Sequence, residues 1–214
     1  LASLYDLTAP SSDHLSEAAI HWATAKLLTA QQQRAPLSTT KKIFTDLWQG
    51  NTTDLPPLSS QQISLLASNE RKFQKRGHYL TGAIWYLGEW FWGLDRLDHL
   101  EQQLINHHLG GSDVKYNRTY LNFCRSYSPS DVLKQHLTEP VNLYFSIRSP
   151  YSHLALHRCI KLTKHYGIPL TVKPIVPMLM RGLKVPASKK FYIFFDTKRE
   201  ANKHKIKYGF VADP

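Results

Sequence analysis

The stretch VNLYFSIRSPYSHLAL, residues 141–156, places a serine hydroxyl where a strand-like run meets a helix-like pattern. Ser149 and Pro150 suit an N-cap and the first helical position. A helix start also presents unpaired N–H groups and the positive end of the macrodipole, so it stabilises an anion such as a thiolate. Two readings stay open: a plain helix cap, or a hydrogen-bond donor to the sulfur of a bound thiol. A serine nucleophile is disfavoured, because His153, one turn further on, is poorly placed to act as its base.

Other residues are weaker candidates for binding a ligand, a metal or a redox partner. Arg148 could bind a substrate carboxylate or simply reach solvent. His153 and His157 have the i, i+4 spacing of metal ligands, but no carboxylate or cysteine accompanies them at ligand spacing, since Cys159 points elsewhere on the helix, so we predict no metal site. The two cysteines, Cys124 and Cys159, form no CxxC motif, which excludes a dithiol oxidoreductase. We expect a reducing, cytoplasmic setting, although a disulfide between them is left open.

The charge of the chain is uneven. The 214 residues carry a net charge of +11, which divides into 9 − 10 = −1 over residues 1–112 and 18 − 6 = +12 over residues 113–214. Such a basic half can serve nucleic acid, acidic lipid or an anionic small molecule. The basic residues are spread out and form no recognised nucleic-acid motif, which argues against nucleic acid. No apolar run is long enough for a membrane span and no signal peptide opens the chain, so we predict no membrane partner.

Hydrophobic periodicity and turn residues predict the order of elements. The first half reads as helices, then a β-hairpin, then a helix. The second half follows a polar linker candidate, with some helix expected at 129–137, and reads as a β-α-β unit and a long basic helix. The predicted ranges are helices at 13–30, 38–50, 59–77 and 94–108, hairpin strands at 80–87 and 89–92, strands at 141–147 and 170–177, and helices at 149–166 and 187–205.

The second half resembles a known family over residues 141–214. LYFSIRSPYSHLAL is similar to the opening of DsbA-like thioredoxin-fold proteins, in the branch of 2-hydroxychromene-2-carboxylate isomerases and kappa-class glutathione transferases. The resemblance implies glutathione as cofactor, with its contacting serine at Ser149 and further cofactor-binding candidates at Arg148 and Tyr151. The later stretch also resembles this branch through a Lys-Lys-x-Tyr-x-x-x-Asp-x-x-Arg pattern, formed by Lys189, Lys190, Tyr192, Asp196 and Arg199.

The first half resembles a different part of the same family. GEWFWGLDRLDHLEQQL is similar to its last hairpin and C-terminal helix, where the two residues before the arginine contact the γ-glutamyl group. Asp95 keeps one of these positions, whereas Leu94 departs from the usual polar residue. Gly82 stands where the family has a cis-proline, which puts glutathione binding there in doubt. Asp95 could alternatively be only the N-cap of the last helix.

The two matches come in reversed order along the chain. We therefore predict an α/β, thioredoxin-like (DsbA-like) fold with an α-helical insertion, divided into 1–110 as the C-terminal half of one domain, 111–138 as linker and 139–214 as the N-terminal half of a second. This reversed order is expected if the chain is the middle of a longer protein with two such domains in tandem. The first residue, Leu1, also favours a fragment, because it is not a methionine. A permuted arrangement, completed within one chain or between two chains, is the alternative.

The resemblance implies a glutathione-dependent isomerase or transferase, with Ser149 stabilising the glutathione thiolate. Its substrate would be small and anionic or aromatic, and a homodimer is expected from the family. The alternatives are a non-catalytic thioredoxin-like binding module and a basic protein associated with nucleic acid. Retention by glutathione resin would favour the first prediction, and steeply salt-dependent binding would favour nucleic acid.

Overall fold

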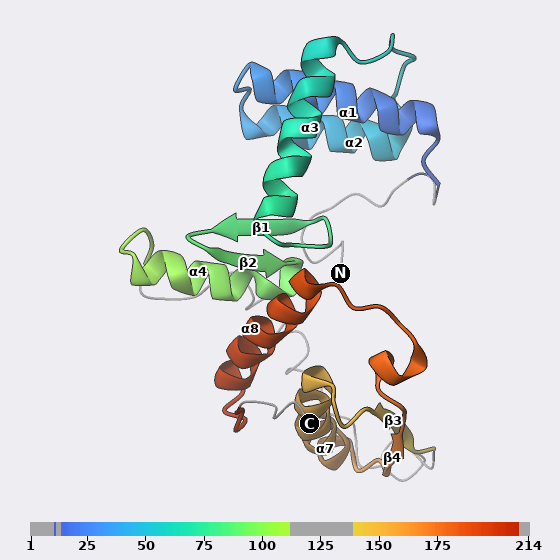
Figure 1. Cartoon of the computed structure of the whole chain (residues 1–214), viewed down its shortest axis with the longest axis vertical. Coiled ribbons are helices and arrows are strands. Elements are labelled where there is room, and N and C mark those ends of the chain that lie inside the picture. The colour runs from blue at the N-terminus through green and yellow to red at the C-terminus, as the bar shows by residue number, and fades with distance from the viewer. Residues whose placement is uncertain (1–10, 12–13, 112–138, 210–214) are drawn as a thin grey trace. The chain divides into compact units, whose positions relative to one another are not determined.

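The structure is a computed structural model that describes residues 11, 14–111 and 139–209. It groups the chain into two compact units, Leu1–Gly77 and His78–Pro214, which are described separately (Figure 1). The predicted helix at 129–137 and Cys124 lie outside the described residues. Within them, no helix has both the length and the apolar character needed to cross a membrane.

The first unit contains three helices in its described part: α1 (Glu17–Gln32), α2 (Leu37–Gln49) and α3 (Ser60–Lys75). Each predicted helix is confirmed within a few residues. Helix α1 begins later than the predicted residue 13, because the Ser16 side chain accepts a hydrogen bond from the Ala19 backbone N–H and the helix begins at Glu17.

The core of the first unit lies between α1 and α2. Buried side chains of both helices form one cluster: Ala19, Trp22, Ala23, Ala30, Ile43 and Leu47. Helix α3 has no fully buried residue, and polar contacts join it to α1. The Gln62 amide donates to the Ala25 carbonyl oxygen and the Thr29 hydroxyl, both at 3.2 Å.

The second unit begins with the predicted hairpin. Strands β1 (Ala83–Tyr86) and β2 (Glu89–Trp92) pair antiparallel through a two-residue turn at Leu87 and Gly88, both with positive φ. Positive φ at both central positions is typical of the type I′ turn that matches hairpin twist. Phe91 points inward and is fully buried. Strand β1 is shorter than predicted and begins at residue 83.

A short 3₁₀ turn, η2 (Leu94–Arg96), joins the hairpin to helix α4 (Leu97–Asn106). After the undescribed stretch come β3 (Val141–Phe145), α7 (Pro150–Tyr166) and β4 (Leu170–Pro174). The two strands are parallel and pair residue for residue along their whole length. A parallel pair requires a crossover, and α7 supplies it, so the predicted β-α-β unit is confirmed.

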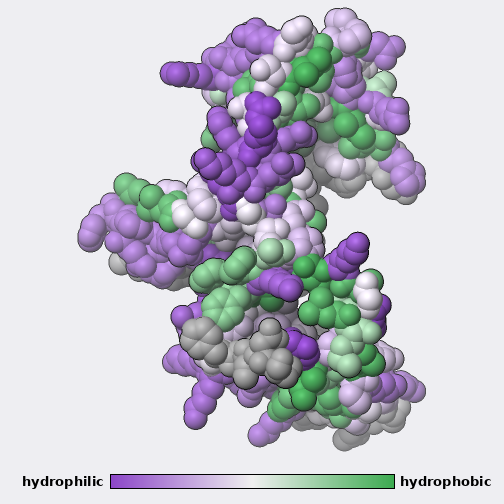
Figure 2. All heavy atoms as spheres, in the orientation of Figure 1, coloured by the Kyte–Doolittle hydropathy of each residue, from purple (hydrophilic) through white to green (hydrophobic). Residues whose placement is uncertain are grey.

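The chain continues through a second 3₁₀ turn, η3 (Met178–Arg181), to helix α8 (Ala187–Lys203). Apolar side chains around η3 are exposed, including Leu179 at 49% and Met180 at 70%, and Figure 2 shows hydrophobic residues gathered on this part of the unit. The described residues therefore form a mixed α/β structure, with two separate two-stranded sheets. The thioredoxin-like arrangement and the assignment to halves of two tandem domains stay predictions.

Candidate functional site

Ser149 caps helix α7, as the sequence predicts. Its backbone is extended and its Oγ accepts a hydrogen bond from the Ser152 backbone N–H at 3.3 Å. The Ser149 N–H in turn donates to the Ser146 carbonyl oxygen at 3.0 Å, and the Ser146 N–H donates to the Ser152 hydroxyl at 3.3 Å. These contacts fix the corner between β3 and α7. Because Oγ serves the helix as an acceptor, its own hydrogen is the part that could be donated to a ligand.

Tyr151, the second residue of α7, connects the start of this helix to α8. Its hydroxyl donates to Oδ2 of Asp196 at 2.6 Å. Burial, together with the hydrogen bond to Asp196 and its negative charge, raises the pKa of Tyr151, so the phenol is a neutral donor. The hydroxyl is thus engaged within the protein. A contact between Tyr151 and glutathione stays a prediction.

Asp196 is the centre of a buried hydrogen-bond network. Its side chain is completely buried, yet both carboxylate oxygens are fully used. Oδ1 accepts from Arg96 Nε at 2.8 Å, from the Tyr192 hydroxyl at 3.2 Å and from Arg199 Nη2 at 3.2 Å. Oδ2 accepts from Arg96 Nη2 at 3.0 Å and from the Tyr151 hydroxyl. The carboxylate therefore receives five hydrogen bonds, including a bidentate pair from one guanidinium.

The electrostatics of this network favour the charged form of Asp196. Burial alone would raise its pKa, but hydrogen bonds from Arg96 and Tyr151 and the positive charges of Arg96 and Arg199 outweigh burial and lower it. Burial works in the opposite direction on Arg96, and the hydrogen bond and charge of Asp196 again outweigh it, so the pKa of Arg96 is raised. Each partner therefore favours the charged form of the other.

Glu200, one turn beyond Asp196 on α8, carries a second set of polar contacts. Its Oε1 lies 2.7 Å from His99 Nε2 on α4, and the neighbouring Lys203 ammonium pairs with Asp98 Oδ2. Burial would raise the pKa of Glu200, but the hydrogen bond from His99 and the charges of Arg96 and Lys203 lower it to about 2. Helix α8 thus meets α4 through matched opposite charges.

Arg199 joins α8 to the hairpin. Its Nη1 lies 3.1 Å from Glu89 Oε2, its Nη2 donates to the Trp90 carbonyl oxygen at 2.8 Å, and its guanidinium lies 4.6 Å from the Phe91 ring centroid. The planar guanidinium can satisfy the carboxylates and stack on the ring at once, which a lysine could not do. The alternating charges of 89–99 and 196–203 therefore bring together two segments that lie far apart in the sequence.

Asp95 is largely exposed, with 73% of its side chain accessible, and lies inside η2. Its Oδ2 accepts from Nη1 of the adjacent Arg96. The alternative role of Asp95 as N-cap of the last helix is wrong, because Arg96 precedes α4 and no side chain caps it. Gly82 has a φ of 71°, and its carbonyl oxygen accepts from the Gly93 N–H at 3.3 Å.

The remaining candidates have other surroundings. Arg148 is exposed in the turn between β3 and α7. The rings of His153 and His157 pack edge to face with centroids 5.0 Å apart, and His153 Nε2 lies 3.0 Å from the Lys207 carbonyl oxygen. Cys159 is a free thiol. No group of three potential metal ligands occurs in the ranges that the structure describes.

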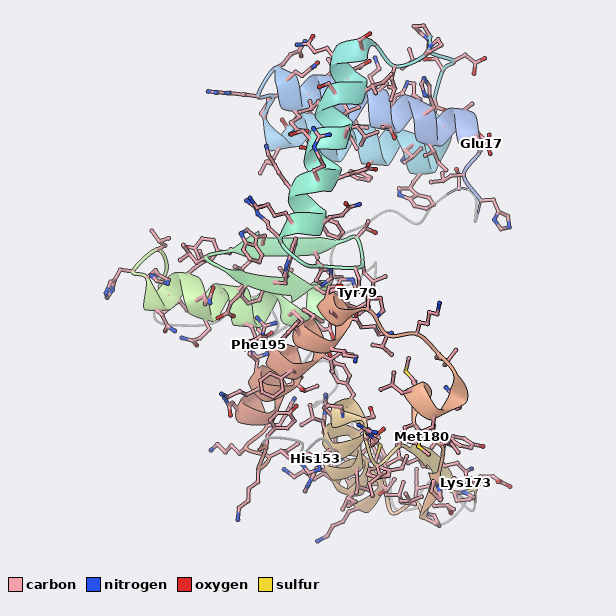
Figure 3. The ribbon with its side chains drawn as sticks, viewed as in Figure 1. Glu17, Tyr79, His153, Lys173, Met180 and Phe195 are labelled. Atoms are coloured by element: carbon pink, nitrogen blue, oxygen red, sulfur yellow. The ribbon has the colours of Figure 1, made fainter. Side chains whose placement is uncertain are left out.

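Sequence reasoning found Tyr192, Asp196 and Arg199 only as members of a pattern. It missed Arg96 and Glu200 as hydrogen-bond and ion-pair partners that join α8 to η2 and α4. Figure 3 helps to locate these helices: it labels Phe195, the neighbour of Asp196 on α8, and His153, which follows Ser149 by one turn on α7. The available signal was the alternation of acidic and basic residues in LDRLDH and in DTKREANK, two charged stretches that complement each other.

No family model, curated protein or solved structure gives a significant match.

Proposed function

We propose that this chain carries a thioredoxin-like glutathione site and acts as a glutathione-dependent isomerase or transferase. The observation that carries the proposal is the corner between β3 and α7. A parallel strand ends there, and Ser149 caps a 17-residue helix with Pro150 at its first position. The resemblance places a thiolate-stabilising serine at this corner, and the positive end of the macrodipole of a 17-residue helix favours an anion such as a thiolate.

The chemistry follows from stabilising the anionic form of the thiol. The hydroxyl of Ser149 donates to the sulfur, lowers the pKa of the glutathione thiol and so raises the fraction of nucleophile near neutral pH. In the isomerase reaction that the resemblance implies, the sulfur bonds to one carbon of a conjugated double bond of an aromatic acid, and the electron pair moves toward its carbonyl oxygen. Rotation about the resulting single bond is followed by expulsion of the same thiolate.

The ion pairs that α8 forms within the second unit argue against the nucleic-acid alternative. Two of its cations, Arg199 and Lys203, pair with Glu89 and Asp98 inside the unit and are largely withdrawn from solvent. A cation that neutralises an internal carboxylate is not available to neutralise a phosphate. The basic character of the helix therefore serves internal packing as well as any anionic ligand.

Calorimetric titration of the chain with glutathione tests the proposal. We expect binding by the wild type and roughly tenfold weaker binding by Ser149→Ala, since a hydrogen bond to a charged group is lost. Ser59→Ala is the matched control, because Ser59 is also an N-cap serine, in the first unit. It should lose a similar cap and keep its affinity.

A second variant separates the cap from the ligand contact. Ser149→Asp keeps an acceptor for the Ser152 N–H but removes the hydroxyl donor and adds a negative charge beside the thiolate. We expect it to retain the helix and to bind glutathione more weakly than Ser149→Ala. No heat with the wild type, or equal affinity in all three proteins, would refute the proposed function.

A further inference from the structure

We propose that the segment between β4 and α8 docks on the surface of an anionic lipid bilayer. Six apolar side chains around η3 are 39–70% exposed, and together they are called the η3 surface: Ile175, Val176, Met178, Leu179, Met180 and Leu183. Exposed apolar residues gathered in one place mark a contact with another protein or with a membrane. The proposal does not depend on glutathione, because none of these residues lies at the corner between β3 and α7.

The backbone of the η3 surface is already folded for such a contact. The N–H groups of residues 180–183 all donate to carbonyl oxygens within the segment, at 2.9–3.2 Å, and Gly182 closes the turn with a φ of 75°. Four consecutive N–H groups are therefore satisfied without water, as entry into the apolar part of a bilayer requires. Because the turn is formed by its own hydrogen bonds, docking costs little further ordering of the chain.

The charge around the η3 surface indicates an anionic partner. Residues 140–195 contain nine lysines and arginines and no aspartate or glutamate, so their net charge is 9 − 0 = +9. Three of these cations, Lys173, Arg181 and Lys184, lie beside or within the segment, are exposed and form no ion pair among the described residues. Figure 3 labels Lys173 and Met180 on this part of the second unit. Each cation held near an anionic bilayer strengthens binding roughly fivefold.

The same charge argues against a second copy of the chain as the partner. A two-fold contact brings the same surface of both copies together, so the η3 surface would meet its own cations. Like charges facing each other across an interface are unfavourable, and residues 140–195 supply no carboxylate to neutralise them. The charge therefore favours a partner that is itself anionic.

The side chains of the η3 surface favour lipid over an acidic protein or a nucleic acid. They are aliphatic or methionine, whereas tight protein contacts depend on tryptophan, tyrosine and arginine, and single-stranded nucleic acid stacks on aromatic rings. Acyl chains accept aliphatic side chains without a fitted pocket. The prediction of no membrane partner rested on the lack of a spanning run and of a signal peptide, and contact at the interface needs neither.

Cosedimentation of the full chain with vesicles of equal parts phosphatidylcholine and phosphatidylglycerol tests the proposal. We expect binding that weakens with added salt and is much weaker on pure phosphatidylcholine. Met180→Ser should bind roughly tenfold more weakly, because an inserted apolar side chain is lost, and Lys184→Gln roughly fivefold more weakly. The matched controls on α2 are Leu37→Ser, at an 86% exposed residue, and Lys42→Gln, at a cation paired with Asp46, and both should bind like the wild type.

Several outcomes would overturn the proposal. Wild type that stays in solution with anionic vesicles has no such surface. Equal vesicle binding by wild type and Met180→Ser, together with tight binding of soluble polyglutamate or an RNA oligonucleotide, would assign the cations to a polyanion. A dimer of the wild type that Met180→Ser dissociates, seen by sedimentation velocity without lipid, would assign the η3 surface to a second copy. Since the altered side chains are exposed, urea unfolding curves of all variants should match that of the wild type.

Discussion

Asp196→Asn tests the buried network most directly. The substitution keeps the size of the side chain and replaces one carboxylate oxygen by an amide nitrogen, which donates instead of accepting. If the amide replaces Oδ2, Arg96 Nη2 and the Tyr151 hydroxyl lose their acceptor. If it replaces Oδ1, three donors lose theirs: Arg96 Nε, the Tyr192 hydroxyl and Arg199 Nη2. At least two hydrogen bonds, one of them to a guanidinium, are lost in either orientation.

The expected cost follows from that count. A hydrogen bond that involves a charged group is worth about 1.5–3 kcal/mol. Removing one partner of a buried ion pair costs about 3–5 kcal/mol, because the other charge stays buried without compensation. Asp196 and most of Arg96 are shielded from solvent, with 0% and 14% of their side chains accessible. We therefore expect Asp196→Asn to lower the free energy of unfolding of the second unit by about 3–5 kcal/mol.

Urea denaturation of the full chain measures this loss, and hydrogen exchange of the α8 backbone assigns the transition to the second unit. Asp46→Asn is the matched control, since Asp46 forms an i, i+4 pair at 3.4 Å on α2 with Lys42, whose side chain is exposed. Such pairs contribute only about 0.3–0.5 kcal/mol. If Asp196→Asn costs no more than Asp46→Asn, the network does not stabilise the unit and the reasoning is wrong.

Three further outcomes are expected. Because the pKa of Glu200 is lowered to about 2, below its usual 4.5, its contribution to stability is present above the usual value and is lost as the pH falls toward 2; Glu200→Gln should flatten the fall of the unfolding free energy in this window, measured by urea titration at several pH values. Gly167→Ala should cost about 1 kcal/mol in thermal or urea unfolding, because Gly167 ends α7 with a φ of 69°, whereas Gly111→Ala, at a position without positive φ, should cost less. Ser59→Ala should lower the helicity seen by circular dichroism and cost about 1 kcal/mol in the first unit, through loss of the capping box on α3; an unchanged unfolding curve would contradict the assigned cap.

The local structure was predictable because its causes are local. Gly50 and Gly167, both with positive φ, end two helices, and Ser149 with Pro150 begins the second of them. The hairpin and the β-α-β unit follow from aromatic, β-branched and turn residues that act within a few positions of one another. The prediction failed at the start of α1, where Ser16 caps the helix and it begins at Glu17, and at the cap of α4, where Asp95 lies inside the preceding 3₁₀ turn.

Part of the candidate site likewise depends on local sequence, and part depends on tertiary packing. The sequence by itself determined that Ser149 caps a helix after a strand, since the corner depends on its own residues. Only the tertiary structure decided that Arg96 and Tyr151 meet at Asp196, because hydrogen bonding between residues 100 and 45 positions apart depends on how α8 packs. Charge alternation in the two segments shows that such pairs can form. The packing removes water from around Asp196, and it thereby decides which carboxylate is buried. That burial in turn decides which ion pairs are strong.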